Sequence, residues 1–396
     1  MKETLRRLLE ALSRSLPEIP FAVQFWDGEH FNLNGDEPAF TLRFSTKESA
    51  RSIFQKGTLG FAEEYMNGNI MIEGDFGEVM RLGMDPLIQY MKLSLGTRLA
   101  LLTQHIKSLN TPRGSRRNIT HHYDKGNDFY QTFLDESLTY SCAYFHVPEN
   151  TLEEAQAQKY EHICRKLDLR EGETLVDIGC GWGGMLIYAA SRYGIKGTGC
   201  SLSKEQVELA RKRVEEAGLE GKVEILLKDY REVEGTFDKF VSIGMFEHVG
   251  KGFIPLFTEK MKALLKPGGA GLLHTIGKEQ ASPGDPWVMK YIFPGGYIPN
   301  LPTIVEVMGK KGLVPQDIEN LRLHYALTLD KWAERFERKA DQIKEMFDEK
   351  FVRMWRLYLN GCAAAFRAGE LRLYQILFTN GLNNNYPLTR SHVYRS

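Results

Sequence analysis

Residues 174–184 read TLVDIGCGWGG, an apolar run with one acid that continues into a glycine-rich turn. Four more apolar runs follow, and stretches with helical spacing separate them: IKGTGCSLS, KVEILLKDY, FDKFVSIGMF and GGAGLLHTI, within residues 195–276. Strands that alternate with helices form right-handed crossovers. We therefore predict an α/β domain with a doubly wound parallel sheet from about residue 151, and a ligand site at the carboxyl ends of its strands.

The spacing of the glycines indicates which nucleotide this turn could hold. A dinucleotide site uses GxGxxG and an acid about 20 residues later that binds the ribose. Here the spacing is GxGxGG, and the next strand ends in GCSLS without an acid, so NAD is disfavoured. Asp177, just ahead of the glycines, suits the ammonium group of a methionine moiety. The segment resembles motif I of the S-adenosylmethionine-dependent methyltransferases.

The chain before this sheet has a different organisation. Residues 4–16 repeat Leu at helical spacing, residues 21–46 alternate as antiparallel strands do, and residues 47–103 return to helical spacing with a turn at GNIMIEGD. These patterns predict a smaller α+β domain. The segment 108–128 is rich in Asn, Gly, Ser and Arg, which is typical of a linker or a loop over a site. We place the domain boundary near residue 110, giving domains 1–110 and 111–396.

Composition excludes several classes of protein. The 396 residues carry 51 Lys+Arg and 51 Asp+Glu, so there is no global field that would attract nucleic acid. The apolar runs are too short to span a membrane, and no signal-peptide core follows Met1, so we expect a cytoplasmic protein. Five cysteines without CxxC spacing predict free thiols, with neither disulfides nor a metal site.

Three further segments narrow the resemblance. HHYDKGNDFYQTFLDESLTYSCAYF (121–145), VSIGMFEHVG (241–250), and FPGGYIP (293–299) with LRLHYALTLDKW (321–332) are similar to the cyclopropane-fatty-acyl-phospholipid synthase and mycolic acid cyclopropane synthase family. The similarity covers about residues 115–396. It implies a class I, Rossmann-like methyltransferase domain. Residues 1–110 resemble more weakly the accessory domain of the phospholipid-acting members, which favours an unsaturated phospholipid as substrate.

The resemblance also implies which residues bind S-adenosylmethionine. A Gln takes the place of the missing ribose acid in this family, and Gln206 is the candidate; the pattern alone also allows a solvated helix residue. Asp229, Tyr230 and Arg231 are expected to flank the adenine. The full set carried over is Tyr123, Tyr140, Ser141, Asp177, Gly179, Cys180, Gly181, Gly183, Ser201, Leu202, Gln206, Asp229, Tyr230 and Arg231.

A second set matches the positions with which the family holds a bicarbonate ion. It comprises backbone groups of Cys142 and Ile276 and the side chains of Glu247, His274 and Tyr325. The resemblance implies that Glu247 orients the anion, and that His274 and Tyr325 donate or relay protons. Cys142 need not be a nucleophile. His248 is expected to support the loop.

The implied chemistry is methyl transfer to a cis double bond through a carbocation, followed by bicarbonate-assisted deprotonation and ring closure. Aromatic faces would stabilise the cation, and the candidates are Tyr123, Phe129, Tyr144 and Tyr297. By analogy with the family, the N-terminal domain would handle lipid or form a homodimer.

The lipid substrate implies peripheral contact with the inner face of the membrane. Arg113, Arg116 and Arg117 could meet anionic headgroups. Residues 330–380 look helical, aromatic and basic. Within them, residues 351–375 interleave arginines with aromatic residues, which fits an interfacial helix or ordinary helix packing: Arg353, Arg356, Arg367 and Arg372 with Trp355, Tyr358 and Phe366.

Three alternatives stay open. The carbocation could be resolved without a ring, giving a methyl-branched, methylene or hydroxylated chain. An ordinary small-molecule methyltransferase would leave TYSCAYF, FPGGYIP and the N-terminal domain unexplained. A lipid-binding scaffold with a relict cofactor site is disfavoured because Glu247, His274 and Tyr325 are all present.

Overall fold

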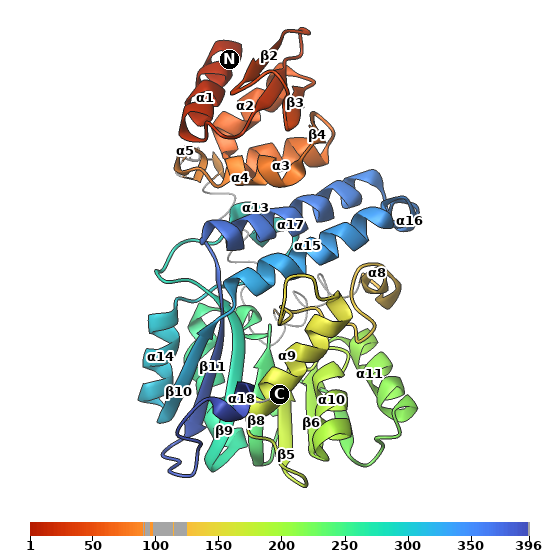
Figure 1. The fold of residues 1–396 in the computed structure, drawn as a ribbon, viewed down its shortest axis with the longest axis vertical. Helices are drawn as coiled ribbons and strands as arrows, with labels where there is room; N and C mark the ends of the chain where they lie inside the picture. Colours follow the sequence, from red (N-terminus) through yellow and green to blue (C-terminus); the bar gives the residue numbers. More distant parts are fainter. Residues whose placement is uncertain (90, 92–95, 98–113, 115–124, 395–396) are drawn as a thin grey trace. The chain divides into compact units, whose positions relative to one another are not determined.

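The computed structural model describes residues 1–89, 91, 96–97, 114 and 125–394. The chain divides into two compact units (Figure 1). The first unit comprises Met1–Lys107, Asp285–Ile292 and Trp332–Gly369, and the second comprises Ser108–Gly284, Phe293–Lys331 and Glu370–Ser396. The predicted boundary near residue 110 lies outside the described residues. Within the described ranges, no helix is long and apolar enough to cross a membrane.

The first unit contains a four-stranded sheet in the order β2-β1-β3-β4. Its strands are β1 (Phe21–Gln24), β2 (His30–Leu33), β3 (Phe40–Phe44) and β4 (Ile70–Gly74). The alternating pattern predicted antiparallel strands, but β1 and β3 pair in parallel. The predicted turn at GNIMIEGD contains β4, since Ile70 is fully buried and pairs with Phe44 of β3.

Helices complete the first unit. From the N-terminal part come α1 (Lys2–Ser15), α2 (Lys47–Lys56), α3 (Thr58–Met66), α4 (Phe76–Gly83) and α5 (Pro86–Gln89). Later parts of the chain add α13 (Pro286–Tyr291), α16 (Ala340–Met346) and α17 (Glu349–Ala368), and the end of α15 (Arg322–Arg338).

The packing of helix α17 shows which of the two interpretations of residues 351–375, an interfacial helix or ordinary helix packing, is correct. It packs against α3 and α4, and the aromatic side chains of Trp355, Tyr358 and Phe366 are buried. Arg356 pairs with Glu337 of α15. Packing therefore accounts for the pattern, and Arg372 is not part of the helix, which ends at Ala368.

The second unit is built on a seven-stranded sheet in the order β10-β11-β9-β8-β5-β6-β7. The five predicted strands are present and parallel: β5 (Thr174–Ile178), β6 (Lys196–Ser201), β7 (Val223–Leu227), β8 (Phe237–Ile243) and β9 (Leu265–Gly277). The doubly wound α/β prediction is thus confirmed for this part.

Two strands at the other edge were not predicted. Residues 372–380, expected to be helical, form β11 (Arg372–Asn380), which lies antiparallel between β9 and β10 (Leu313–Asn320). Seven of the nine residues of β11 are buried. A strand covered on both faces has a nearly continuous apolar run without alternation, and such a run cannot be distinguished from a buried helix by its period.

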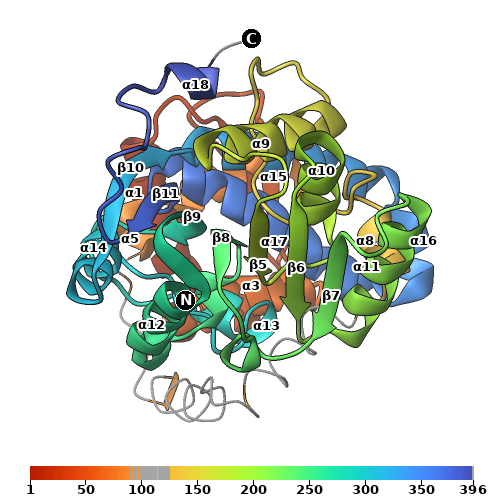
Figure 2. The ribbon, with the colours of Figure 1, turned by 90° about the horizontal axis from the view of Figure 1, so that it is seen from below.

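Helices cover both faces of this sheet (Figure 2). Leu175, Val241 and Leu272 face one layer, and their neighbours Val176, Phe240 and Leu273 face the other. The first layer contains α9 (Leu152–Lys166), α10 (Gly184–Tyr193) and α11 (Lys204–Glu216); the second contains α12 (Ile254–Leu264) and α14 (Leu301–Lys310). The unit also includes α8 (Asn127–Gln131), α18 (Ser391–Tyr394) and the short helices η1 (Tyr230–Glu232), η2 (Phe246–His248) and η3 (Lys251–Phe253).

Candidate active site

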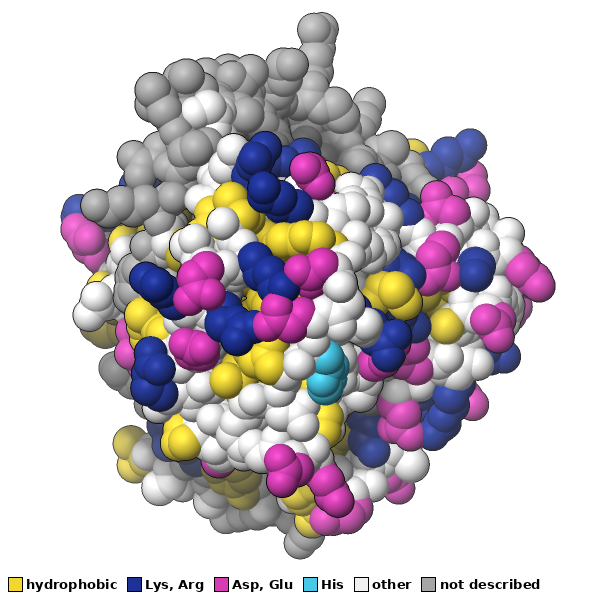
Figure 3. Space-filling view, turned by 90° about the horizontal axis from the view of Figure 1, so that it is seen from above, with side chains coloured by type: hydrophobic (Ala, Val, Ile, Leu, Met, Phe, Trp, Pro, Cys, Tyr) yellow, Lys and Arg dark blue, Asp and Glu magenta, His cyan; other side chains and the backbone are white. Residues whose placement is uncertain are grey.

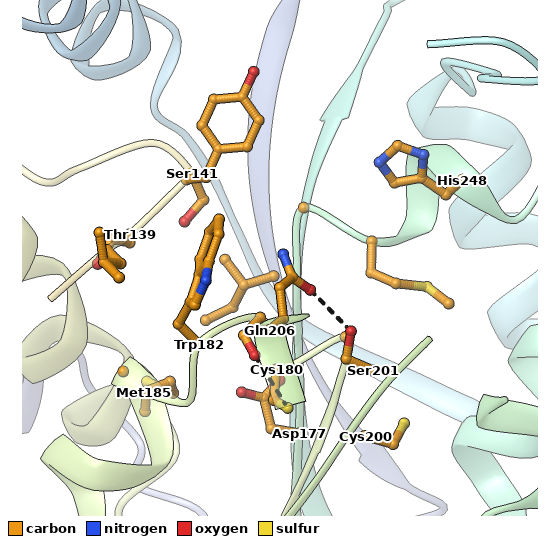
Figure 4. A pocket seen from close by; sticks show the side chains of 18 of the residues that line it. Thr139, Ser141, Asp177, Cys180, Trp182, Met185, Cys200, Ser201, Gln206 and His248 are labelled. Atoms are coloured by element: carbon orange, nitrogen blue, oxygen red, sulfur yellow. Dashed lines mark hydrogen bonds between the residues drawn. The ribbon is translucent and has the colours of Figure 1, made fainter. Parts of the chain in front are cut away.

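A pocket opens at the carboxyl ends of the parallel strands of the second unit (Figure 4). The space between its walls amounts to about 890 Å³, the open mouth included. Most of the predicted cofactor contacts line it: Tyr140, Ser141, Asp177, Gly179, Cys180, Gly181, Ser201, Leu202, Gln206 and Tyr230. Gly183, Asp229 and Arg231 lie next to lining residues. Tyr123 is outside the described residues.

The glycine turn after β5 forms the floor of the pocket. Gly179 has φ +85°, and a Cβ there would lie 2.7 Å from Cβ of Met245, so a side chain would collide. Gly181 has φ +54°, and a Cβ there would meet no described atom within 4 Å. The turn therefore presents its backbone to open space, as a site for a nucleoside requires.

Asp177 is the penultimate residue of β5, and its carboxyl group lies inside the protein. Burial raises the pKa of Asp177 to about 7, and the nearby charge of Lys159 opposes that rise. Its Oδ1 is buried and has no hydrogen-bond partner among the described residues. A buried acceptor without a partner is costly, so this oxygen is a position for a donor on a ligand.

Lys159 of α9 is a pocket residue that the sequence analysis missed. Its side chain is fully buried, and its Nζ donates a hydrogen bond of 3.0 Å to Oγ of Ser141. Burial lowers the pKa of Lys159 to about 7, against the attraction of Asp135, Cys142 and Asp177. The signal in the sequence was its position, four residues from Ala155 and from Ile163 on the apolar face of α9.

Ser201 and Gln206 are joined at the end of β6. Ser201 Oγ donates a hydrogen bond of 2.9 Å to Oε1 of Gln206 (Figure 4). Ser203 caps α11 by accepting from the backbone N–H of Gln206. Gln206 is buried and lines the pocket, so it is not a solvated helix residue.

The segment Leu138–Ser141 forms a further wall. The amide of Gln156 donates to the Ser141 carbonyl at 2.9 Å, and the ring of Tyr140 packs on Tyr130 at 5.3 Å between centroids. Trp182 also lines the pocket, and its Nε1 donates to Asn127 at 2.7 Å. Trp182 belongs to the loop 176–183, which the resemblance placed at the cofactor as a whole.

Of the three residues expected to flank the adenine, one lines the pocket and two do not. Tyr230 lines the pocket together with Lys228. Asp229 instead accepts from the backbone and guanidinium of Arg231, at 3.0 and 3.2 Å. The Arg231 guanidinium lies 4.9 Å from the Tyr230 ring centroid and 5.3 Å from that of Phe253. Asp229 and Arg231 therefore hold the loop that carries Tyr230.

Glu247 and Ile276 of the second predicted set are in direct contact. Glu247 lies in η2, after β8, and its Oε1 accepts a short hydrogen bond from the backbone N–H of Ile276. Burial raises the pKa of Glu247 to about 7, although the Ile276 N–H opposes the rise. Its second oxygen, Oε2, is buried and finds no partner in the described part of the chain.

His274 lies two residues before Ile276 on β9. Its side chain is fully buried, and the amide of Gln375 approaches Nδ1 at 3.2 Å. No described group pairs with Nε2 of this ring. Burial holds the pKa of His274 well below its usual range. Like Glu247, His274 has one polar atom that a protein group contacts and one that has no partner among the described residues.

Cys142 is tied to the start of α15, the helix that carries Tyr325. Thr328 accepts from the backbone N–H of Ala143 at 3.0 Å, and His324 accepts from that of Phe145, also at 3.0 Å. Burial raises the pKa of the Cys142 thiol, so it is no nucleophile. Tyr325 is half-buried on the first turn of α15.

His248 lines the pocket, whereas the described candidates for the aromatic wall do not. Burial lowers the pKa of His248 to about 4, so its ring is neutral. Phe129 is fully buried among aromatic rings. The Tyr144 ring stacks between the rings of His162 and His324, at 4.1 and 4.7 Å. Tyr297 packs on the core and donates its backbone N–H to the Glu247 carbonyl.

Comparison with known proteins identifies the family. The model of the mycolic acid cyclopropane synthetase family matches residues 110–376. The chain belongs to this family. It is accordingly an S-adenosylmethionine-dependent methyltransferase, as the motifs predicted. Residues 8–86 match a separate domain family of unknown function.

Relatives at the level of sequence cover nearly the whole chain. A probable fatty acid methyltransferase of Pseudomonas putida is 38% identical, over 95% of this chain and 97% of its own length. The cyclopropane-fatty-acyl-phospholipid synthase of Escherichia coli K12 is 37% identical, over 90% and 92%. A tuberculostearic acid methyltransferase of Mycobacterium tuberculosis is 35% identical, over 92% and 88%.

Solved structures resemble about two thirds of the chain. A cyclopropane synthase of M. tuberculosis has a TM-score of 0.64 at 34% identity, covering 67% of this chain and 98% of its own. A mycolic acid cyclopropane synthase complexed with SAH and CTAB has a TM-score of 0.63 at 33% identity, with the same coverage. These likenesses confirm the class I methyltransferase fold.

The residues present fit the cosubstrate of this methyltransferase family. Oδ1 of Asp177, which no described residue pairs, can accept from an ammonium group, and the Gln206 amide, fixed by Ser201, can bind hydroxyl groups such as those of a ribose. The open space before Gly181 admits a nucleoside against the backbone. S-adenosylmethionine carries these groups, and when bound it supplies an electrophilic methyl group.

Proposed function

We propose that this protein is a cyclopropane-fatty-acyl-phospholipid synthase, which adds the methylene bridge across a cis double bond of an unsaturated acyl chain. The proposal is carried by two buried polar atoms that have no hydrogen-bond partner among the described residues: Oε2 of Glu247, which follows β8, and Nε2 of His274, near the end of β9. The name of the E. coli relative supports the substrate. The proposal also assigns the predicted contacts with S-adenosylmethionine to the residues that line the pocket.

The reaction makes two demands on the protein. The double bond attacks the sulfonium methyl, so a C–C bond forms as the S–C bond breaks, and the lipid becomes a carbocation. A base must then take a proton from the new methyl group as the ring closes. Positioning the weak nucleophile supplies much of the rate, and the base must not itself trap the cation.

Glu247 and His274 suit a small oxyanion in the role of that base, and bicarbonate is our candidate. Glu247 Oε2 can accept the bicarbonate O–H, while the Ile276 N–H holds the other carboxylate oxygen in place. His274 Nε2, without a partner in the described chain, can donate to a second bicarbonate oxygen. Tyr325 and the backbone of Cys142 complete the proposed set.

The lipid must be drawn from a bilayer, so we also propose peripheral membrane association, with the N-terminal unit as a lipid-handling or dimer-forming module. The face in Figure 3 shows Lys and Arg interspersed with Asp and Glu. Pairs such as Arg43 with Glu73, 2.9 Å apart, belong to this unit. The basic candidates Arg113, Arg116 and Arg117 lie outside the described residues.

A fatty-acyl methyltransferase with a methyl-branched or methylene product is the second candidate. The P. putida and M. tuberculosis relatives, named as fatty acid methyltransferases, favour it. Both candidates use the same pocket and the same lipid class. They differ in how the carbocation is resolved, so the product distinguishes them.

The test is to incubate the full chain with S-adenosylmethionine, bicarbonate and vesicles of a cis-monounsaturated phospholipid, and to analyse the acyl chains. We expect a mass gain of one CH₂ group and upfield cyclopropane proton signals in NMR. Glu247→Gln should abolish this product, whereas Glu259→Gln, an exposed acid on α12, should not. Olefinic or branched-methyl signals would establish the second candidate, and an unchanged lipid would contradict both.

A further inference from the structure

A buried chain of polar side chains lies behind His274. Gln375 of β11 pairs with His274 of β9 across the antiparallel ladder, and both side chains are fully buried. The Gln375 side-chain nitrogen lies 3.2 Å from Nδ1 of His274. Its oxygen lies 2.9 Å from Nζ of Lys166.

Lys166 determines which way the Gln375 amide points. Its Nζ also lies 2.6 Å from Oε2 of Glu319, which in turn is 2.7 Å from Nε2 of His162. Burial lowers the pKa of Lys166, but the ion pair with Glu319 opposes that shift and favours the ammonium form. An ammonium group donates but never accepts. The Gln375 oxygen must therefore face Lys166, which leaves the NH₂ group facing His274.

This orientation fixes the tautomer of His274. An NH₂ group is a donor, so Nδ1 has to accept, and an imidazole with an accepting Nδ1 carries its proton on Nε2. A protonated ring would place an N–H against the NH₂ group. The buried charges of Lys159 and Lys166 also disfavour an imidazolium, while Glu319 favours one. His162, which contacts the Glu319 carboxylate, also lowers the pKa of His274.

We propose that Gln375, anchored by Lys166, is a positioning residue that holds His274 as the neutral Nε2–H tautomer, so that His274 offers a hydrogen-bond donor and not a base. The proposal rests on the proposed function in one respect, that the atom receiving this hydrogen bond is an oxygen of the bound oxyanion. It assigns proton removal to a group other than His274.

The position of Gln375 explains why its role was not visible in the sequence. It is a polar residue in the buried run LYQILFT, and its partners lie 101 and 209 residues away in the chain. A polar side chain in a strand buried on both faces needs partners for each of its atoms. Here the two partners are chemically opposite, a donor and an acceptor, and that pair gives the amide a single orientation.

The test measures the tautomer directly. In the full-length protein with ¹⁵N-labelled histidine, imidazole NMR distinguishes a protonated from an unprotonated ring nitrogen; the signals of His274 are those that disappear in His274→Asn. We expect protonated Nε2 and unprotonated Nδ1 across the neutral pH range. Protonated Nδ1 in the wild-type protein would overturn the proposal, with no variant required.

Gln375→Glu is the discriminating variant because it keeps the shape and replaces the donor by an acceptor. One oxygen of the introduced carboxylate still accepts from Lys166, and the other now favours a proton on Nδ1. We expect protonated Nδ1 in the spectrum and a fall in the rate of product formation of at least about 10-fold. Gln316→Glu on the neighbouring strand β10, whose side chain bonds to Thr379, is the matched control and should change neither.

The outcomes separate this proposal from the proposed function. An unchanged tautomer in a folded Gln375→Glu protein would overturn the positioning role. A switched tautomer with an unchanged rate would support the tautomer assignment and contradict the part of the proposed function that gives His274 a contact with the oxyanion.

Discussion

Asp177, Glu247 and His274 each lie buried with one polar atom that no described residue pairs. Polar atoms in protein interiors are paired as a rule, and exceptions mark ligand positions or ordered water. These three residues could be predicted as site residues because they stand at positions of the family's motifs. Lys159 was not predicted, since a lysine within an amphipathic helix is ordinarily solvated. Its spacing from Ala155 and Ile163 places it on the apolar face of α9, but the packing of that helix is needed to show that the lysine is buried.

Glu247→Gln should make the protein more stable at alkaline pH while it abolishes the activity. The folded-state pKa of Glu247, about 7, lies above the usual value of 4.5, so the wild-type protein loses stability as the pH rises from about 4.5 through 7. Gln does not titrate. The variant should therefore gain up to about 3 kcal/mol over the wild type by pH 8. Urea unfolding at pH 5 and pH 8 measures this, and a pH-independent difference would contradict it.

Lys159→Met should weaken binding of S-adenosylhomocysteine by about 10-fold, the loss expected for one charge-assisted hydrogen bond. Ser141 loses its donor, and Asp177 loses the positive charge that favours its carboxylate form. Isothermal titration calorimetry measures the dissociation constant. Lys212→Met, which removes an exposed lysine of α11, is the control. Equal affinities of both variants would show that Lys159 does not act on the site.

At the level of elements, the parallel half of the sheet was predictable and the antiparallel edge was not. An α-helix separates β5 from β6, β6 from β7 and β8 from β9, and such crossovers set the strand direction. The helical stretch predicted between β7 and β8 is only the three-residue η1. The strands β4, β10 and β11 are defined by their partners: Ile70 by Phe44, and Gln375 by His274. Such pairings are absent from local periodicity. The contact of Glu247 with Ile276 is likewise a product of neighbouring strand ends.

The N-caps of α9 and α11 allow a matched test of how an element supports the site. Thr151 and Ser203 each accept a backbone N–H in the first turn of their helix. Replacing either by Ala should cost about 1 kcal/mol of unfolding free energy. Only Ser203→Ala should also weaken cofactor binding, because the N–H that it caps belongs to Gln206. Denaturation and calorimetry check both, and a weakened affinity in Thr151→Ala would contradict a local effect.

At the scale of the whole molecule, the first unit is assembled from three segments of the chain. Its later segments contact the N-terminal one: Trp287 donates to Met66, and Arg353 donates to the Tyr65 carbonyl. The composition of the sequence shifts once, near residue 110, so it predicted a single boundary. The chain in fact returns to the first unit twice, at Asp285–Ile292 and at Trp332–Gly369. The neutral net charge agrees with the mixed charges in Figure 3.

Deleting residues 1–107 should consequently uncover apolar surface on α13 and α17. We expect the shortened chain to bind a hydrophobic dye more strongly than the full chain and to aggregate at lower concentration. Dye fluorescence and light scattering at matched concentration measure this. A shortened chain that stays monomeric without added dye binding would show that α13 and α17 do not depend on the N-terminal segment.

The central claim is that the carbocation closes to a ring after loss of a proton from the transferred methyl group. The most direct measurement supplies S-adenosylmethionine with a fully deuterated methyl group, together with cis-monounsaturated phospholipid vesicles. The account predicts a saturated acyl chain that retains two of the three deuterons, both on a cyclopropane carbon. A product that retains all three deuterons on a methyl branch, or two on an olefinic carbon, would contradict it.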